Sequence, residues 1–181
     1  MVPNLFSCLA LWARIVGWLT LGGASLLLAS CSSTPAPVVK EPTILRLRLV
    51  AADNVNPNEW GTAAPILVRV YELKSATAFE NADFFTLQND DKKILGDDVL
   101  AVDEMILRPG DIREIARKSN TATTAIGVLA GYRDLGKSVW RAVYRLPAAP
   151  DAAWYRAVIP DKEQKLILRL DQRTVSISKS D

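Results

Sequence analysis

Apolar and polar residues alternate with a period of two along most of the chain after residue 42, a pattern typical of β-strands with one buried face. In residues 43–52, three leucines fall on one face, and Arg46 and Arg48 fall on the other. Residues 66–73 and 125–132 are apolar at nearly every position, which predicts strands covered on both faces. The remaining predicted strands are 99–107, 112–118, 138–146, 166–170 and 174–178. About eight strands separated by turn residues predict a mainly β protein, a two-sheet β-sandwich.

Two segments between these strands break the alternation. Residues 108–111 read Arg-Pro-Gly-Asp, which predicts a type II turn because Gly110 accepts the positive φ of its third position. Residues 75–90 carry apolar side chains three apart, among them Phe79 and Phe85, with Ser75 placed to act as an N-cap. We therefore predict one short added helical segment that covers a sheet edge or an open end of the sandwich.

Residues 1–30 predict a lipoprotein signal peptide. Arg14 precedes the apolar run 15–28, which has the length of a signal-peptide core and is too short to cross a bilayer of about 30 Å. Cys31 follows Leu-Ala-Ser, as in the bacterial lipobox, and this predicts that Cys31 is acylated and becomes the mature N-terminus. A transmembrane anchor and ordinary cleavage near Ala29 are the alternatives.

Residues 31–41 predict a lipidated N-terminus and a tether, and residues 42–181 the β-sandwich domain. The tether is rich in Ser, Thr and Pro, and ten extended residues reach at most about 35 Å. Ser32 stands where many inner-membrane lipoproteins have Asp, so we expect lipid anchoring to the periplasmic face of the outer membrane.

The composition excludes several classes of chemistry. The chain has no histidine, and its two cysteines, Cys8 and Cys31, lie at the N-terminus, which argues against His- or Cys-based catalysis and against metal sites or other cofactors. The net charge is +2 with the charges scattered, so we expect no nucleic-acid partner. These counts leave carboxylate chemistry open.

A carboxylate hydrolase would need converging acids, which three adjacent pairs could supply. These pairs are Asp90-Asp91, Asp97-Asp98 and Asp103-Glu104. Neighbouring side chains on a strand point to opposite faces, and the first two pairs read as solvated loops, so we predict no enzyme and no small-molecule substrate. Likewise, we interpret Arg46, Arg48, Arg69, Arg141 and Arg145 as solvating outer sheet faces, with a basic contact face as the alternative.

The segment between the first two strands is the best candidate for binding. Residues 53–65 are long for a hairpin connection and carry Trp60 among turn-forming residues. A tryptophan there either packs inward or meets a partner, and the sequence leaves both open. A second candidate is residues 148–164, with Trp154 and Tyr155 between prolines.

Taken together and in their order along the chain, the motifs of this sequence resemble those of TssJ, the outer-membrane lipoprotein family of the type VI secretion system membrane complex. The resemblance rests on Cys31, Asn56-Pro57, Gly61, residues 65–73, Phe79, residues 82–84, Leu87, Leu95-Gly96, residues 107–110, residues 126–130, Tyr132-Arg133 and Trp140-Arg141. It implies a transthyretin-like β-sandwich with an added helical element.

The resemblance also implies a structural role. TssJ holds the periplasmic C-terminal domain of the inner-membrane protein TssM, through the loop between its first two strands. Carried onto this chain, the partner-binding residues are Asn54, Val55, Asn56, Pro57, Asn58, Glu59, Trp60 and Gly61. The alternative is a periplasmic lipoprotein that binds a small hydrophobic ligand inside the sandwich.

Overall fold

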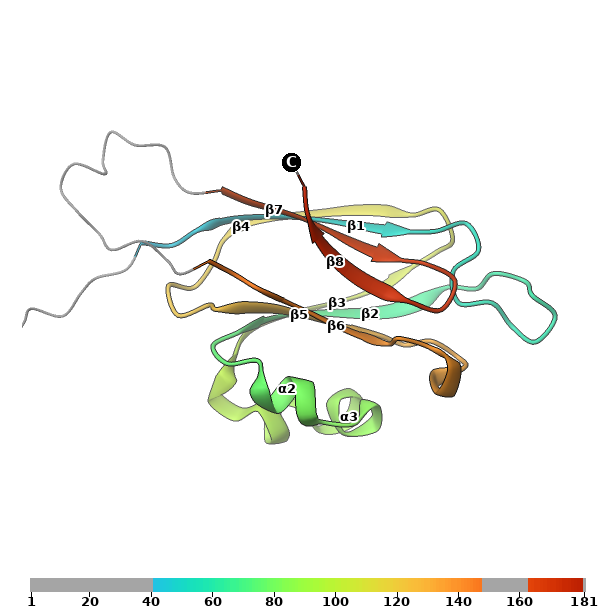
Figure 1. Cartoon of the computed structure of the whole chain (residues 1–181), viewed down its shortest axis with the longest axis horizontal. Coiled ribbons are helices and arrows are strands. Elements are labelled where there is room, and N and C mark those ends of the chain that lie inside the picture. Colours follow the sequence, from blue (N-terminus) through green and yellow to red (C-terminus); the bar gives the residue numbers. More distant parts are fainter. Residues whose placement is uncertain (1–40, 148–162, 181) are drawn as a thin grey trace, which may run out of the picture. The chain divides into compact units, whose positions relative to one another are not determined.

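A computed structural model describes residues 41–147 and 163–180, and the chain from residue 38 onward forms one compact unit. Eight strands form two four-stranded sheets, ordered β4-β1-β7-β8 and β3-β2-β5-β6 (Figure 1). The strands are β1 (Ile44–Ala51), β2 (Ile66–Leu73), β3 (Val99–Leu107), β4 (Ile112–Lys118), β5 (Ala125–Ala130), β6 (Arg141–Arg145), β7 (Glu163–Leu170) and β8 (Val175–Lys179). The predicted mainly β sandwich is confirmed.

The main core lies between the two sheets. Leu45, Leu47 and Leu49 of β1 point inward and are buried against inward residues of β2 and β5, such as Val70 and Val128. β1 pairs with β7 in parallel and with β4 antiparallel, while the second sheet is antiparallel throughout. The alternation read from the sequence therefore follows the buried and exposed faces of the first sheet.

A helical layer covers the outer face of the second sheet. It consists of α2 (Thr77–Asn81) and α3 (Phe84–Leu95), followed by a single turn of 3-10 helix, η2 (Gly96–Asp98), and Figure 1 shows α2 and α3 beside β5 and β6. Phe79, Phe84 and Leu87 form a second core against Tyr71 and Leu129 of that sheet. The prediction that the helical segment covers an edge or open end is therefore wrong, and β2 and β5 are apolar on both faces because they lie between two cores.

Phe79 packs on the sheet because β5 has a glycine beneath it. A Cβ atom at Gly127 would come within 2.9 Å of the Phe79 ring, closer than van der Waals contact allows. The Phe79 ring also packs against Tyr71, with ring centroids 5.2 Å apart. Gly127 thus allows the close approach of α2 to the sheet.

The helical segment is interrupted at Ala82 and Asp83. The N-cap of α2 is Ala76, so the prediction of Ser75 as N-cap is wrong by one residue, although the Ser75 hydroxyl accepts from the Thr77 amide at 3.4 Å. The N-cap of α3 is Asp83, whose Oδ1 accepts a hydrogen bond from the Thr86 amide at 3.0 Å. Its Oδ2 accepts from the Thr86 hydroxyl at 2.5 Å, and these bonds from Thr86 lower the pKa of Asp83. Phe85, expected to pack on the sheet, is 62% exposed because the new helix turns it outward.

Two of the five strand arginines hold this layer in place. Arg69 donates to the carbonyl oxygens of Leu87 and Gln88, and Arg141 donates to those of Phe79 and Ala82. The expectation that they solvate an outer face is wrong for this pair, because the helices cover that face. Burial lowers the pKa of Arg141.

The other three strand arginines, Arg46, Arg48 and Arg145, are exposed as expected. The predicted turn at residues 108–111 is also present, with φ +80° at Gly110 and a hydrogen bond from the Asp111 amide to the Arg108 carbonyl. Cys31, the signal peptide and nearly all of the tether lie outside the described residues, as do Trp154 and Tyr155. No helix within the described ranges is long and apolar enough to cross a membrane.

Candidate functional site

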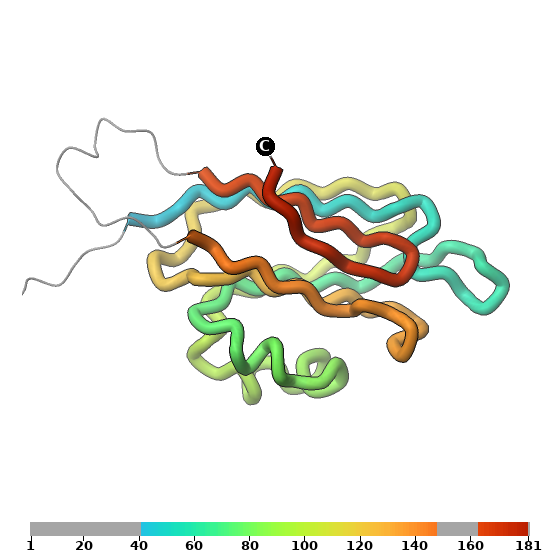
Figure 2. The backbone as a smooth tube through the Cα atoms, in the orientation of Figure 1, coloured from blue at the N-terminus to red at the C-terminus, as the bar shows by residue number. Residues whose placement is uncertain are grey.

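The β1–β2 loop, residues 52–65, projects beyond the ends of the strands (Figure 2). Its base is joined to its surroundings by backbone hydrogen bonds. The Asn56 amide donates to the Gln172 carbonyl in the β7–β8 turn at 3.1 Å, and the Ala64 amide donates to the Val55 carbonyl at 3.1 Å. Val55 itself is buried in the main core. The base of the loop is therefore part of the folded body.

Asn56 joins three connections at this end of the sandwich. Its side chain donates from Nδ2 to the Pro65 carbonyl at 2.8 Å, and its Oδ1 accepts from the Arg133 amide at 2.8 Å. The residue is only 4% exposed and has φ +49°, a conformation that asparagine tolerates better than most residues. Asn56 therefore fixes the direction in which the loop leaves the body.

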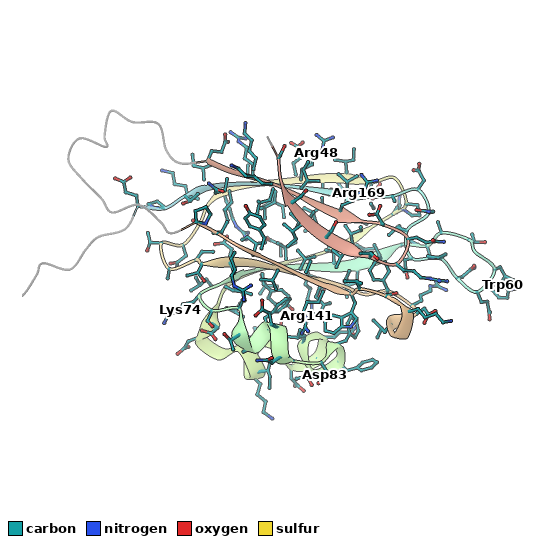
Figure 3. The ribbon with its side chains drawn as sticks, in the orientation of Figure 1. Arg48, Trp60, Lys74, Asp83, Arg141 and Arg169 are labelled. Carbon is teal, nitrogen blue, oxygen red and sulfur yellow. The ribbon has the colours of Figure 1, made fainter. Side chains whose placement is uncertain are left out.

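Asn58 closes the tip of the loop into a tight turn. Its Oδ1 accepts from the Trp60 amide at 3.0 Å and from the Thr62 amide at 2.9 Å. The Gly61 amide donates to the Asn58 carbonyl at 3.0 Å, with Gly61 at φ +80°. The turn holds Trp60 away from the body with 80% of its surface exposed (Figure 3). Of the two readings of Trp60, the structure shows the outward one.

A shallow groove lies beside Trp60. It has a volume of about 530 Å³ and is bordered by residues of the loop, of the β5–β6 connection and of the β7–β8 turn. Arg133, Lys137 and Arg173 supply positive charge, and Lys137 pairs with Asp134 at 3.3 Å. No sequence pattern places these residues beside the loop, because they are distant from it along the chain and come beside it only in the fold.

The eight predicted partner-binding residues divide into two groups. Asn54, Glu59, Trp60 and Gly61 are exposed, and Asn58 is half-buried. Val55, Asn56 and Pro57 are buried and support the loop from beneath. A partner could touch the first group directly, whereas the second group acts through the shape of the loop.

A tyrosine stabilises the neighbouring turn. Tyr132, two residues after β5, donates a hydrogen bond from its hydroxyl to the Asp171 carbonyl at 3.0 Å, and its burial raises its pKa well above the ordinary value. The hydroxyl hydrogen bond therefore ties the chain after β5 to the β7–β8 turn. The three connections around Trp60 are thus held by one set of buried polar contacts.

The carboxylates form structural ion pairs rather than a converging pair. Asp103 bonds Arg117 between the sheets, while Glu104 bonds Arg69 on the outer face of the second sheet, so their divergence is confirmed. Asp90 and Asp91 lie in α3 rather than in the predicted loop. Asp97 and Asp98 lie in η2, which also corrects the loop prediction.

Among the acids in the described ranges, Glu72 is the most buried, and it lies near the end of β2 away from the loop. It is 2% exposed and accepts hydrogen bonds from Arg117 Nε at 2.6 Å and Thr123 Oγ1 at 2.9 Å. Burial alone would lower the pKa of Arg117, but the charges of Glu72 and Asp103 outweigh this effect and raise it. The cluster joins the two sheets electrostatically.

Neither a metal site nor an internal ligand site is visible in the part of the chain that the structure describes. No group of three or more Cys, Asp or Glu residues there could hold a metal ion. The space between the described sheets is filled by the side chains of the main core, from Leu45 on β1 to Val175 on β8. The exposed tip of the β1–β2 loop is accordingly the most distinctive surface feature.

The family model T6SS-SciN, described as "Type VI secretion lipoprotein, VasD, EvfM, TssJ", matches residues 43–176. The chain is similar to the crystal structure of the T6SS lipoprotein TssJ1 from Pseudomonas aeruginosa, with 36% identity, a TM-score of 0.68, and coverage of 77% of this chain and 98% of that one. The Serratia marcescens protein Lip, described as a membrane-bound component of the type VI secretion system, shares 30% identity with a TM-score of 0.61. That match covers 77% of this chain and 97% of Lip.

A structure described as the TssM C-terminal domain (869–1107) from EAEC also matches, at 22% identity and a TM-score of 0.55, over 77% of this chain and 98% of that one. At this identity the match supports the fold alone. A search of curated proteins finds no match. From the family match and the two closer structures, the chain belongs to the TssJ family of type VI secretion lipoproteins, which are components of a membrane complex and not a known enzyme family.

Proposed function

We propose that this chain ties the periplasmic C-terminal domain of a TssM protein to the outer membrane, without catalysing a reaction. In this role the acylated Cys31 is the membrane anchor, and the β1–β2 loop is the contact with TssM. Family membership supports the setting in the type VI membrane complex. The single observation that carries the contact is Trp60, held 80% exposed by a turn that Asn58 closes.

An exposed tryptophan on an ordered loop is suited to be a binding hot spot. Tryptophan is enriched among residues that dominate interface energies, and a preformed loop loses little conformational entropy when it binds. Asn56 and Asn58 supply that order through their side-chain hydrogen bonds. We expect the partner to offer an apolar pocket for the indole.

Trp60→Ala tests the contact. The purified protein and the TssM periplasmic domain of the same organism are titrated by calorimetry. We expect Kd to rise about 30-fold or more, the loss of about 2 kcal/mol typical of a hot spot. Phe85→Ala is the matched control, since Phe85 is also aromatic and exposed but lies on α3. Equal affinity of wild type and Trp60→Ala would place the contact elsewhere.

Cys31→Ser tests the anchor separately. The variant should leave the outer-membrane fraction while its body keeps the wild-type melting temperature, because residue 31 precedes the compact unit. Recovery of Cys31→Ser in the outer membrane at wild-type level would contradict acylation as the anchor.

A further inference from the structure

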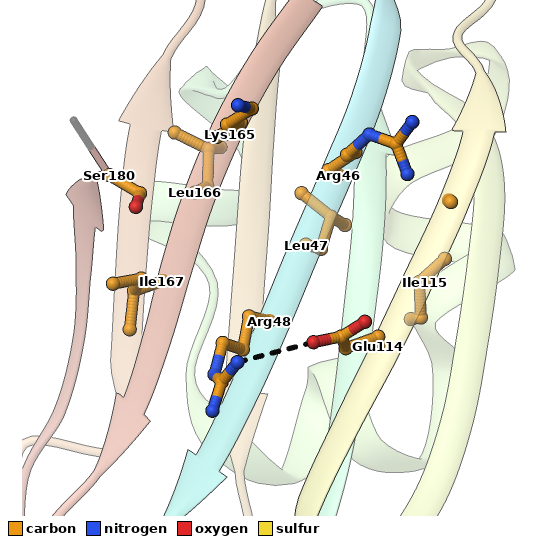
Figure 4. A pocket seen from close by; sticks show the side chains of 10 residues that line it. Arg46, Leu47, Arg48, Glu114, Ile115, Lys165, Leu166, Ile167 and Ser180 are labelled. Carbon is orange, nitrogen blue, oxygen red and sulfur yellow. Dashed lines mark hydrogen bonds and ion pairs between the residues drawn. The ribbon is translucent and has the colours of Figure 1, made fainter.

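The two outer faces of the sandwich differ in what covers them. The helical layer covers the second sheet, whereas the outer face of the first sheet, β4-β1-β7-β8, has no described element over it. The register between β1 and β7 places outward-facing residues of the two strands side by side on this open face, such as Arg46 beside Lys165 and Arg48 beside Ile167. Figure 4 shows Arg46, Arg48 and Lys165 standing on it.

This open face is basic. By strand register and exposure, it carries five basic side chains against two acidic ones; they are Arg46, Arg48, Lys118, Lys165 and Arg169, with Glu114 and Glu163. The net charge of this face is therefore +3. It falls to +2 when Asp171, just beyond β7, is included. The face also exposes half of the surface of Ile112, an apolar side chain without cover from the described residues.

The acids on this face pair with the arginines in solvent-exposed positions. Arg48 Nη1 lies 3.3 Å from Glu114, and both side chains are more than half exposed. Arg169 Nε lies 3.0 Å from Asp171, and Arg46 pairs with Glu163. Exposed ion pairs of this kind contribute about 0–1 kcal/mol to stability. The guanidinium groups can therefore replace their carboxylate partners with phosphate oxygens at little cost in free energy.

The opposite side of the protein is acidic. The helical layer, residues 77–98, contains six acidic residues against two lysines, a net charge of −4. The sheet face beneath it adds Arg69, Arg141, Arg145 and Glu104, so this side of the protein has a net charge of −2. In Figure 3, Arg48 and Arg169 lie on one side of the layers and Asp83 on the other. A charge difference of this size across the layers turns the basic sheet toward an anionic surface and the helices away from it.

We propose that the open face of the β4-β1-β7-β8 sheet binds the anionic headgroups of a phospholipid surface. The biological relevance of this contact rests on the proposed anchoring of the chain at a membrane. The open sheet face presents its arginines and lysines on the same side of the protein, which allows several of them to meet phosphates of one surface. The contact restricts the rotation of the body about its tether and so limits the directions in which Trp60 can face.

The test uses the compact unit, residues 38–181, which holds every described strand and both cores but lacks Cys31. It is sedimented with vesicles of phosphatidylcholine and with vesicles in which about a third of the lipid is phosphatidylglycerol. We expect binding to the anionic vesicles alone, and its loss at about 1 M salt, where the screening length falls to about 3 Å.

Two matched pairs of variants identify the face. Arg48→Gln with Arg169→Gln should lower vesicle binding about 25-fold, since each basic residue near an anionic surface contributes about five-fold. Lys92→Gln with Lys93→Gln removes the same charge from exposed positions of α3 and should leave binding within about two-fold of wild type. Trp60→Ala should also keep vesicle binding, which separates this face from the β1–β2 loop.

Several results would overturn the proposal: no binding to anionic vesicles, equal binding to both vesicle types, or equal losses in the two double variants. If the fragment does not bind anionic vesicles, the partner of the basic face is instead an acidic protein. Because the fragment has no residue 31, failure of acylation in the Cys31→Ser experiment leaves the vesicle result intact, and the two proposals fail separately.

Discussion

Replacement of Asn56 by alanine should destabilise the protein and loosen the β1–β2 loop, although no residue of the main core changes. The side chain makes two hydrogen bonds, to the Pro65 carbonyl and from the Arg133 amide. Each contributes about 1 kcal/mol. Alanine at φ +49° adds about 1 kcal/mol of backbone strain. The free energy of unfolding should therefore fall by about 3 kcal/mol.

Urea denaturation measures this loss, with a parallel fall in Tm of about 6–12 °C. Asn54→Ala is the control, because Asn54 is an exposed asparagine of the same loop and should change stability by less than about 0.5 kcal/mol. Limited proteolysis should cut the loop of Asn56→Ala faster than that of Asn54→Ala. If both variants unfold within about 0.5 kcal/mol of wild type, Asn56 does not hold the loop and the reasoning fails.

Three further variants test the contacts that hold the layers together. Glu72→Ala removes the buried partner of Arg117, which keeps its bond to Asp103, and should cost about 1–3 kcal/mol by urea denaturation; an unchanged free energy of unfolding would count against a stabilising ion pair. Gly127→Val should lower stability by about 1–3 kcal/mol because its side chain meets Phe79, and unchanged stability would mean that α2 yields freely. Asp83→Ala should lower Tm at neutral pH. Because hydrogen bonds from Thr86 hold the pKa of Asp83 below its ordinary value, its stabilisation is present above that value and lost as pH falls through the lowered pKa. The Tm difference should therefore shrink in acid, and a constant difference would contradict the cap.

The strands could be predicted from the sequence because their signal is local. The alternation in β1 and the continuous apolar run in β2 and β5 can each be read from a few consecutive residues. The first indicates a strand with one covered face, and the second a strand with two. The position of the helical layer could not be predicted in this way. Its amphipathic pattern indicates that one side is buried but does not say against which surface, and a sandwich offers edges, ends and faces.

The roles of single polar residues depended on distant contacts. Asn56 and Asn58 look equivalent within a loop rich in turn-forming residues, yet only Asn56 meets Gln172 and Arg133 and becomes buried. Arg69 looks like a solvated strand residue until α3 places its carbonyl groups over it. Sequence patterns report the chemistry available at a position, while the partner that uses it is set by tertiary structure.

The parallel pairing of β1 with β7 has a consequence for the order of folding. β1 is the first strand of the body and an interior strand of its sheet, yet Ile44 pairs with Glu163, near the end of the chain. This sheet cannot be completed until β7 is available, and contacts between such distant segments slow folding. A chain that emerges from its N-terminus therefore keeps β1 incompletely paired until β7, about 120 residues further along, has been synthesised. The topology therefore delays completion of this sheet and favours a long-lived, incompletely folded chain.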